Sequence, residues 1–149
     1  MRSRILLALA LVAALIAVPV ATGATKKRHA LEMTARMAVI SESGARPLRW
    51  AGEVVGKPTG RSALVLVSTA SGPTSTGKAV LYTKHGTVLA TTENAIEPQP
   101  DGAVRFPGTF KVTGGTGRYR GATGGGTFDG TVPANSNVLT AQLKGKIRY

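Results

Sequence analysis

The sequence predicts an all-β protein that folds as a closed antiparallel barrel of about eight strands. From residue 30 to residue 149, apolar and polar residues alternate with a period of two, and clusters of Gly, Pro, Ser and Thr separate the alternating segments. No segment has the pattern of a long amphipathic helix, and parallel strands need such crossovers. The sheet is therefore expected to be antiparallel, and closure would leave no exposed edge strand.

The first 24 residues are typical of a secretory signal peptide. Two arginines in residues 1–4 precede an unbroken apolar run of 14 residues (5–18), and Pro19 is followed by small residues up to Ala24. The run is shorter than the roughly 20 residues that span a membrane as a helix. We expect cleavage after Ala24 and a secreted, extracellular protein. Membrane anchoring by an uncleaved signal stays open as the alternative, because the basic residues 26–28 resist export.

Composition narrows the chemistry of the remaining chain, a basic N-terminus (25–29) followed by one domain (30–149). Without Arg2 and Arg4, the chain has 17 lysines and arginines against 7 carboxylates, a net charge of +10 that favours an anionic partner. There is no cysteine, hence no disulfide, and two histidines form no recognisable ligand set, so no metal and no cofactor are expected. The few aromatic residues do not interleave with the basic ones, which argues against nucleic acid as the partner.

The first expected strands follow from alternation and from turn residues. Residues 30–41 place Leu31 and the odd-numbered residues up to Val39 on one apolar face. Residues 48–56 and 62–68 are expected to pair as a hairpin around Pro58 and Gly60. A loop is expected over residues 71–77, and a second hairpin joins residues 78–84 to residues 87–92.

The second half of the domain contains the clearest strands. Residues 94–102, with two prolines, are expected to form an irregular connection. Residues 103–113 follow as a strand, with Gly108 between two inward phenylalanines, and residues 127–132 form another. The last strand, residues 138–149, alternates apolar residues with polar ones, including the outward Lys144, Lys146 and Arg148.

The segment that joins the expected strands 103–113 and 127–132 is rich in glycine. Residues 110–128 contain seven glycines, and their spacing resembles the motif GGTGxF/YxxAxG of the allene oxide cyclase and dirigent proteins and of related secreted bacterial barrels. The resemblance implies a closed antiparallel barrel in which the glycines adopt positive φ angles at a strand exit and Tyr119 plugs one barrel end. It also implies that a homo-oligomer is an option. The matching positions are Gly114, Gly115, Thr116, Gly117, Tyr119, Gly121, Ala122 and Gly124.

Three functions remain open. The first is non-catalytic binding of a small apolar ligand or an envelope component in the barrel, with Phe106, Phe110, Tyr119 and Tyr82 as the expected contacts. The second is an isomerase, cyclase or dirigent-like enzyme that guides a reactive intermediate. For it, Glu53 is the expected catalytic group, since both faces of residues 50–55 look apolar and burial would raise the pKa of an inward carboxyl. Whether the protein is an enzyme stays open. The third is electrostatic attachment to anionic envelope polymers or lipids through six basic residues, Lys26, Lys27, Arg28, Lys144, Lys146 and Arg148.

Overall fold

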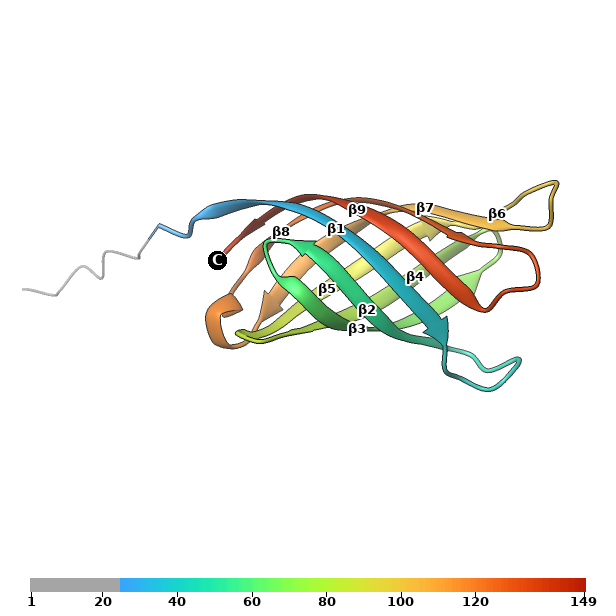
Figure 1. Ribbon diagram of the computed structural model, residues 1–149, viewed down its shortest axis with the longest axis horizontal. Coiled ribbons are helices and arrows are strands. Elements are labelled where there is room, and N and C mark those ends of the chain that lie inside the picture. Colours follow the sequence, from blue (N-terminus) through green and yellow to red (C-terminus); the bar gives the residue numbers. More distant parts are fainter. Residues whose placement is uncertain (1–24) are drawn as a thin grey trace, which may run out of the picture.

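The computed structural model describes residues 25–149, so the expected signal peptide (1–24) lies outside the described residues. Nine strands and one short helix make up the described chain, and Figure 1 shows them as a barrel whose strands run obliquely along its length. In chain order the elements are β1 Arg28–Val39, β2 Leu48–Lys57, β3 Gly60–Ser71, β4 Thr74–Thr83, β5 Gly86–Ala95, β6 Glu97–Pro98, β7 Val104–Gly115, the 3-10 helix η1 Gly117–Tyr119, β8 Thr123–Val132 and β9 Val138–Arg148.

The sheet closes on itself through eight of these strands. Every pairing is antiparallel, β1 pairs with both β2 and β9, and β5 pairs with both β4 and β7. The two-residue β6 lies beside β7 outside this ring. The fold is therefore an all-β closed antiparallel barrel of eight strands, as the alternation of the sequence predicted, and each long strand has hydrogen-bonded neighbours on both sides.

The alternation in β1 shows how the sequence selects the inner face. Leu31, Met33, Ala35 and Met37 are each at most 8% exposed, whereas the polar residues between them are exposed. A slip of one residue would turn this apolar set to solvent, so burial determines the register with β2 and β9. β9 follows the same rule with Leu139, Ala141 and Ile147 inside.

The structure differs from the predicted elements in several places. Residues 71–77 are not a loop, because β3 runs to Ser71 and β4 begins at Thr74, leaving a two-residue hairpin. β8 begins at Thr123 rather than at residue 127, since its glycines pair with β9 despite their low strand propensity. The third difference is η1, a short 3-10 helix within the glycine-rich segment, where no helix was expected.

Among the described residues, no helix has the length and hydropathy to cross a membrane.

The two barrel ends are built differently, and we name each after its largest buried residue. The Tyr119 end holds the β2–β3 and β4–β5 turns, the β7–β8 connection with η1, and the first and last residues of the barrel. The Trp50 end holds the other four connections, including the β1–β2 loop and the segment between β5 and β7. In Figure 1 the Tyr119 end is on the left, where the described chain begins and ends.

Tyr119 closes its end because the β7–β8 connection folds back over the barrel. The backbone N–H of Arg118 donates to the carbonyl of His85 (2.9 Å), and the N–H of Thr116 donates to that of Thr87 (3.0 Å). Gly117 has a φ of +56°, and a Cβ atom there would press on the backbone of His85, so glycine is required by both conformation and space. The docked connection leaves Tyr119 and Ala122 only 1% exposed each.

A second, smaller cluster fills the Trp50 end. Met37, Trp50 and Leu139 are buried there, and the Trp50 indole N–H donates to the Ser68 hydroxyl at 3.2 Å. The side chains packed around these three are only partly buried, namely Val39, Leu48, Leu64, Leu66, Phe106 and Val132. This end is thus rimmed by half-buried apolar side chains, whereas the other is sealed.

Candidate functional site

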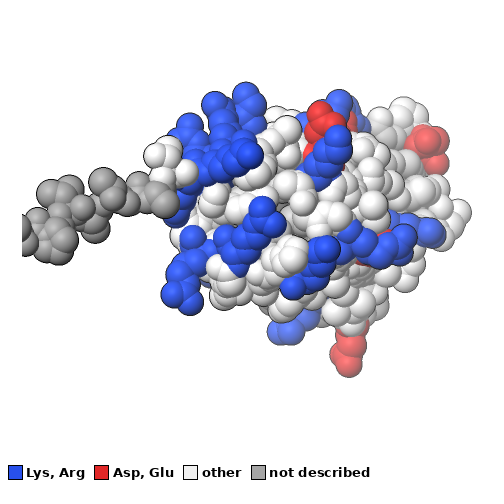
Figure 2. Space-filling model, turned by 60° about the vertical axis from the view of Figure 1, so that its left-hand side comes forward, with Lys and Arg blue, Asp and Glu red and all other residues white. Residues whose placement is uncertain are grey.

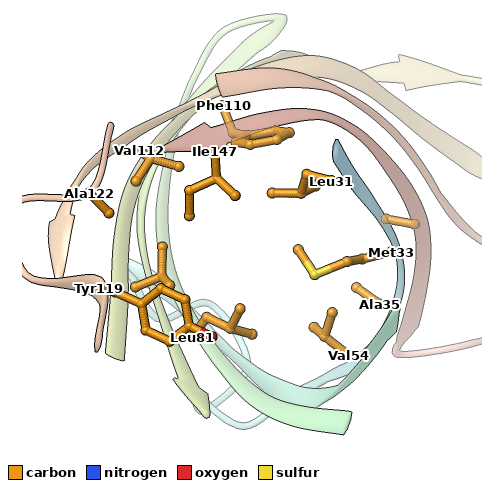
Figure 3. Close-up of a cluster of buried hydrophobic side chains, with 12 residues drawn as sticks. Leu31, Met33, Ala35, Val54, Leu81, Phe110, Val112, Tyr119, Ala122 and Ile147 are labelled. Carbon is orange, nitrogen blue, oxygen red and sulfur yellow. The ribbon is translucent and has the colours of Figure 1, made fainter. Parts of the chain in front are cut away.

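An apolar cavity of about 100 Å³ lies inside the barrel between the two ends. Figure 3 shows the buried side chains pointing inward around this space. The lining extends from Leu31 and Ile147 near the Tyr119 end to Met37, Leu66 and Leu139 near the Trp50 end. Since Leu64 and Leu66 belong both to the lining and to the half-buried side chains around the Trp50 cluster, the cavity reaches this rim.

Few polar groups face the cavity. Thr59 and Thr92 are the only lining residues with hydroxyls, and the Thr59 Oγ1 atom donates to the Met33 sulfur at 3.5 Å. None of the residues lining the cavity has an ionisable side chain. Such a lining can bury an apolar molecule, but it supplies no group able to transfer a proton.

The structure separates the four aromatic residues expected to contact a ligand. Phe110 lines the cavity, Phe106 lies in the rim at the Trp50 end, and Tyr119 forms the plug. The inward placement of Tyr82 was wrong: this residue is 50% exposed on the outer face of β4. Its neighbour Leu81 takes the inward position (6% exposed), and successive side chains of a strand point to opposite faces.

Glu53 also points outward, which corrects its expected place inside the barrel. Trp50 and Val54 are the buried residues of β2, so Glu53 falls on the outer face, where its carboxylate lies 2.6 Å from the Arg61 guanidinium. The sequence misled because Val55, also outward, is an apolar residue that is 45% exposed. Glu53 therefore lies outside the cavity.

An aromatic stack covers the Tyr119 plug. The His29 ring stacks on Tyr149 with centroids 4.5 Å apart, Tyr119 meets Tyr149 edge-on at 4.8 Å, and the Arg118 guanidinium lies 5.3 Å from the Tyr149 ring centre. Burial raises the pKa of the Tyr149 hydroxyl, with nearby Tyr119 adding to the effect and Arg118 opposing it. These contacts tie both ends of the described chain to the plug.

The motif glycines of the β7–β8 connection surround this plug but contribute no reactive group. Gly117 and Gly121 have φ angles of +56° and +63°, and the Lys26 ammonium donates to the Gly121 carbonyl. Gly115 approaches the backbone of Thr87, so a side chain there would clash with β5. The motif thus builds the closure of one barrel end.

On the outer wall, Lys144, Lys146 and Arg148 are exposed on β9 as the alternation predicts. At the Trp50 end, in contrast, a basic residue is paired: the Arg105 guanidinium donates to the Asp129 carboxylate and lies 3.7 Å from the Glu97 carboxylate. The hydrogen bond from Arg105 lowers the pKa of Asp129 and raises that of Arg105. The basic residues of β9 form no such pair within residues 25–149.

Sequence reasoning overlooked the small residues that shape the cavity. Ala35 on β1 and Ala141 on β9 are direct partners in the sheet, and both line the cavity. Ala79 and Ala90, which are partners on β4 and β5, do the same across the barrel. Paired alanines at inward positions of neighbouring strands were the signal that could have indicated a hollow interior.

Comparison with known proteins found no family model, no curated protein and no solved structure that matches this chain. Within residues 25–149, no three His, Asp or Glu side chains group closely enough to hold a metal ion.

Proposed function

We propose that this protein binds a slender apolar molecule inside its barrel without transforming it. The observation that supports this most directly is the cavity of about 100 Å³, whose lining is aliphatic and aromatic apart from two threonine hydroxyls. A cavity with so few polar partners does not hold water well, so an apolar guest replaces empty space rather than a bound solvent molecule. Each buried CH₂ group of such a guest would contribute about 0.8 kcal/mol.

The size and shape of the cavity favour a narrow guest. Apolar cavities of about 150 Å³ accept a benzene ring, so the present volume corresponds to a ligand of that order or smaller in its buried part. The lining residues of β1 run from Leu31 to Met37, which is about 20 Å of strand. A cavity this long and this small suits an unbranched chain. A polar head group, if the guest has one, would remain at the rim of the Trp50 end.

The same interior weakens the case for a cyclase-like or dirigent-like enzyme. Such an activity needs at least one polar or ionisable group facing the reacting molecule, and the carboxylate expected at Glu53 lies outside the barrel. The hydroxyls of Thr59 and Thr92 remain, and they can orient a guest but are poor acids and bases. Binding therefore agrees better with the lining than catalysis does.

Two further parts of the proposal rest on the sequence. The glycine motif around Tyr119 favours a barrel related to the allene oxide cyclase and dirigent proteins, and its position at a strand exit next to an inward tyrosine supports that relation. The apolar run of residues 5–18 favours export with cleavage after Ala24. The intact mass of the protein recovered from an expressing host tests cleavage, and a mass that includes residue 1 contradicts it.

The binding proposal is tested with protein expressed from the full sequence and titrated with parinaryl alcohol, a fluorescent unbranched polyene that serves as the apolar dye. Ala141→Leu adds three carbons to the inner wall beside Ala35, and it is expected to weaken dye binding at least about tenfold by filling the cavity. Ala63→Leu adds the same group to the exposed outer face of β3 and is expected to leave binding unchanged. Displacement of the dye by straight-chain alcohols of increasing length then measures the cavity.

Trp50 supplies an independent readout. It is the only tryptophan of the sequence and it belongs to the cluster at the end of the cavity. Its emission is expected to shift when a guest enters, and native mass spectrometry should show one guest per barrel. Equal dye binding by Ala141→Leu and the original protein, with no change in Trp50 emission, would place the dye on the outer surface and refute the proposal.

A further inference from the structure

The positive charge of the described chain is concentrated at one end of the barrel. The Tyr119 end, counted as its turns and the nearer half of each strand, has twelve lysines and arginines against the carboxylates Glu32 and Glu53. The Trp50 end, counted in the same way, has five basic and five acidic side chains. The net charge of +10 therefore belongs entirely to the Tyr119 end. In Figure 2 blue side chains gather around the end where the described chain begins.

Little of this charge is neutralised within the described chain. Residues 25–149 contain three ion pairs, two of which use Arg105 at the Trp50 end, while the third joins Arg61 to Glu53. The other eleven basic side chains of the Tyr119 end are exposed and form no ion pair with described residues. Their mutual repulsion destabilises the barrel slightly, and an anionic partner would relieve it.

Some of these basic side chains line a groove of about 660 Å³. It lies on the outer wall over β1, β9 and β8, and the backbone of Gly124, Gly125 and Gly145 contributes to its floor. Lys146 stands in it between Ala30 of β1 and Gly125 of β8, its register partners on either side, so no large neighbour covers its ammonium. The groove has four basic side chains in its lining, and two of them, Arg28 and Arg148, are register partners on β1 and β9.

The basic side chains follow the strand at regular intervals. Lys144, Lys146 and Arg148 are alternate residues of β9, so their attachment points are about 7 Å apart along the strand. A flexible phosphodiester chain can place successive phosphates at a similar interval. The single carboxylate that lines the groove, Glu32, pairs in register with Lys144 at the far edge from Arg148.

We propose that this groove binds a linear phosphodiester polymer that carries no bases. A hollow on the curved side of a barrel fits a chain better than it fits the flat surface of a bilayer. Tyr149, which follows Arg148, already stacks on His29, meets Tyr119 edge-on and lies beside Arg118, so its ring is poorly placed to stack a nucleic-acid base. Recognition would therefore depend on phosphate contacts alone.

The test compares two charge reversals of equal size in protein expressed from the full sequence. Lys144→Glu with Lys146→Glu alters the groove, and Arg49→Glu with Lys78→Glu makes the same change in net charge at exposed positions nearer the Trp50 end. The probe is labelled poly(glycerol phosphate), followed by fluorescence anisotropy. Binding should weaken steeply between about 50 and 200 mM salt. The groove variant is expected to lose on the order of tenfold or more in affinity, and the control about twofold or less.

The neutral pair Lys144→Gln and Lys146→Gln keeps the test valid if the glutamate variant does not fold, and it should lose a smaller, still measurable share of the affinity. Equal losses in groove and control variants would mean diffuse attraction and overturn the proposal. Tighter binding to vesicles containing phosphatidylglycerol, or to a single-stranded oligonucleotide, than to the polymer would overturn it in favour of a membrane or of nucleic acid. Apolar dye binding is expected to be unchanged in every variant, which separates this proposal from the one above.

Discussion

Both ends of the barrel contain buried apolar side chains, but the two ends use them differently. At the Tyr119 end, a connection of seven residues (116–122) folds over the opening, and the side chains beneath it are almost fully buried. At the Trp50 end, four connections leave the opening rimmed by half-buried residues such as Phe106 and Val132. Charge divides the ends in the same way, with all of the net positive charge at the sealed one. The sealed end is thus suited to stability and surface attraction, and the rimmed end to exchange of a guest.

Removing the plug tests this division most severely. Tyr119→Ala deletes a ring that is 1% exposed, and the loss of burial together with the cavity left behind should lower the free energy of unfolding by about 3–5 kcal/mol. Urea unfolding followed by circular dichroism measures it. Tyr82→Ala is the matched control, because that ring is 50% exposed, and its effect should stay within about 0.5 kcal/mol. Similar losses for the two variants would show that the connection is not a plug.

The path of the same connection can be tested through its backbone. Gly117→Ala forces a side chain into a φ of +56° and against the backbone of His85, so it should destabilise the barrel by about 2 kcal/mol or more. Gly72 has a similar φ of +59° in the β3–β4 turn at the Trp50 end, but no atom lies within 4 Å of its added Cβ. Gly72→Ala should therefore cost only about 1 kcal/mol. Thermal unfolding of both variants isolates the cost of the close approach.

The rim of the Trp50 end should respond differently from the plug. Phe106→Ala removes a half-buried ring, so we expect a loss of only about 1–2 kcal/mol, below the range for fully buried aromatic residues. Its larger effect should be kinetic, because a shorter side chain at the rim lets an apolar guest leave faster. Stopped-flow dye displacement measures that rate. Dissociation that accelerates in Tyr119→Ala and not in Phe106→Ala would mean that guests leave through the other end.

The fold could be predicted from the sequence because inward and outward residues alternate along the strands of a barrel wall. In β1 and β9, alternation alone separates the inner face from the outer one, and burial of that face determines the register. The turn between β3 and β4 was misplaced because Ser75 is a polar residue that nevertheless points inward, being only 7% exposed. Polarity is a poor guide where a strand approaches the barrel mouth and its side chains meet the rim.

The site was harder to predict, because a cavity is empty space and its lining comes from several strands. Glu53 was misplaced since Val55 made both faces of β2 look apolar, and only the register with β1 and β3 turns Val54 inward. The hollow interior depends on alanines that meet between neighbouring strands, and a single strand read alone does not show that they meet. The concentration of charge at one end likewise needs the chain path, since the basic residues are scattered along the sequence.

The smallest expected effect concerns the ion pairs that brace the rim. Arg105 joins β7 to Asp129 of β8 and to Glu97 of β6, and its hydrogen bond lowers the pKa of the Asp129 carboxyl below its usual 3.8. A lowered carboxyl pKa stabilises the fold above the unfolded pKa, and this contribution is lost as the pH falls through the folded value. Both side chains are 47% exposed, so water and salt should keep the contribution small.

Asp129→Asn should remove that contribution, and the urea midpoints at pH 6 and pH 3 should then differ less than they do in the original protein. Glu42→Gln is the control, because Glu42 is an exposed loop carboxylate that forms no ion pair within residues 25–149. High salt should reduce the difference between the two variants, since exposed pairs are screened. A midpoint difference that is the same for both variants would show that Arg105 does not brace the rim. The Trp50 end would then depend on its apolar side chains alone.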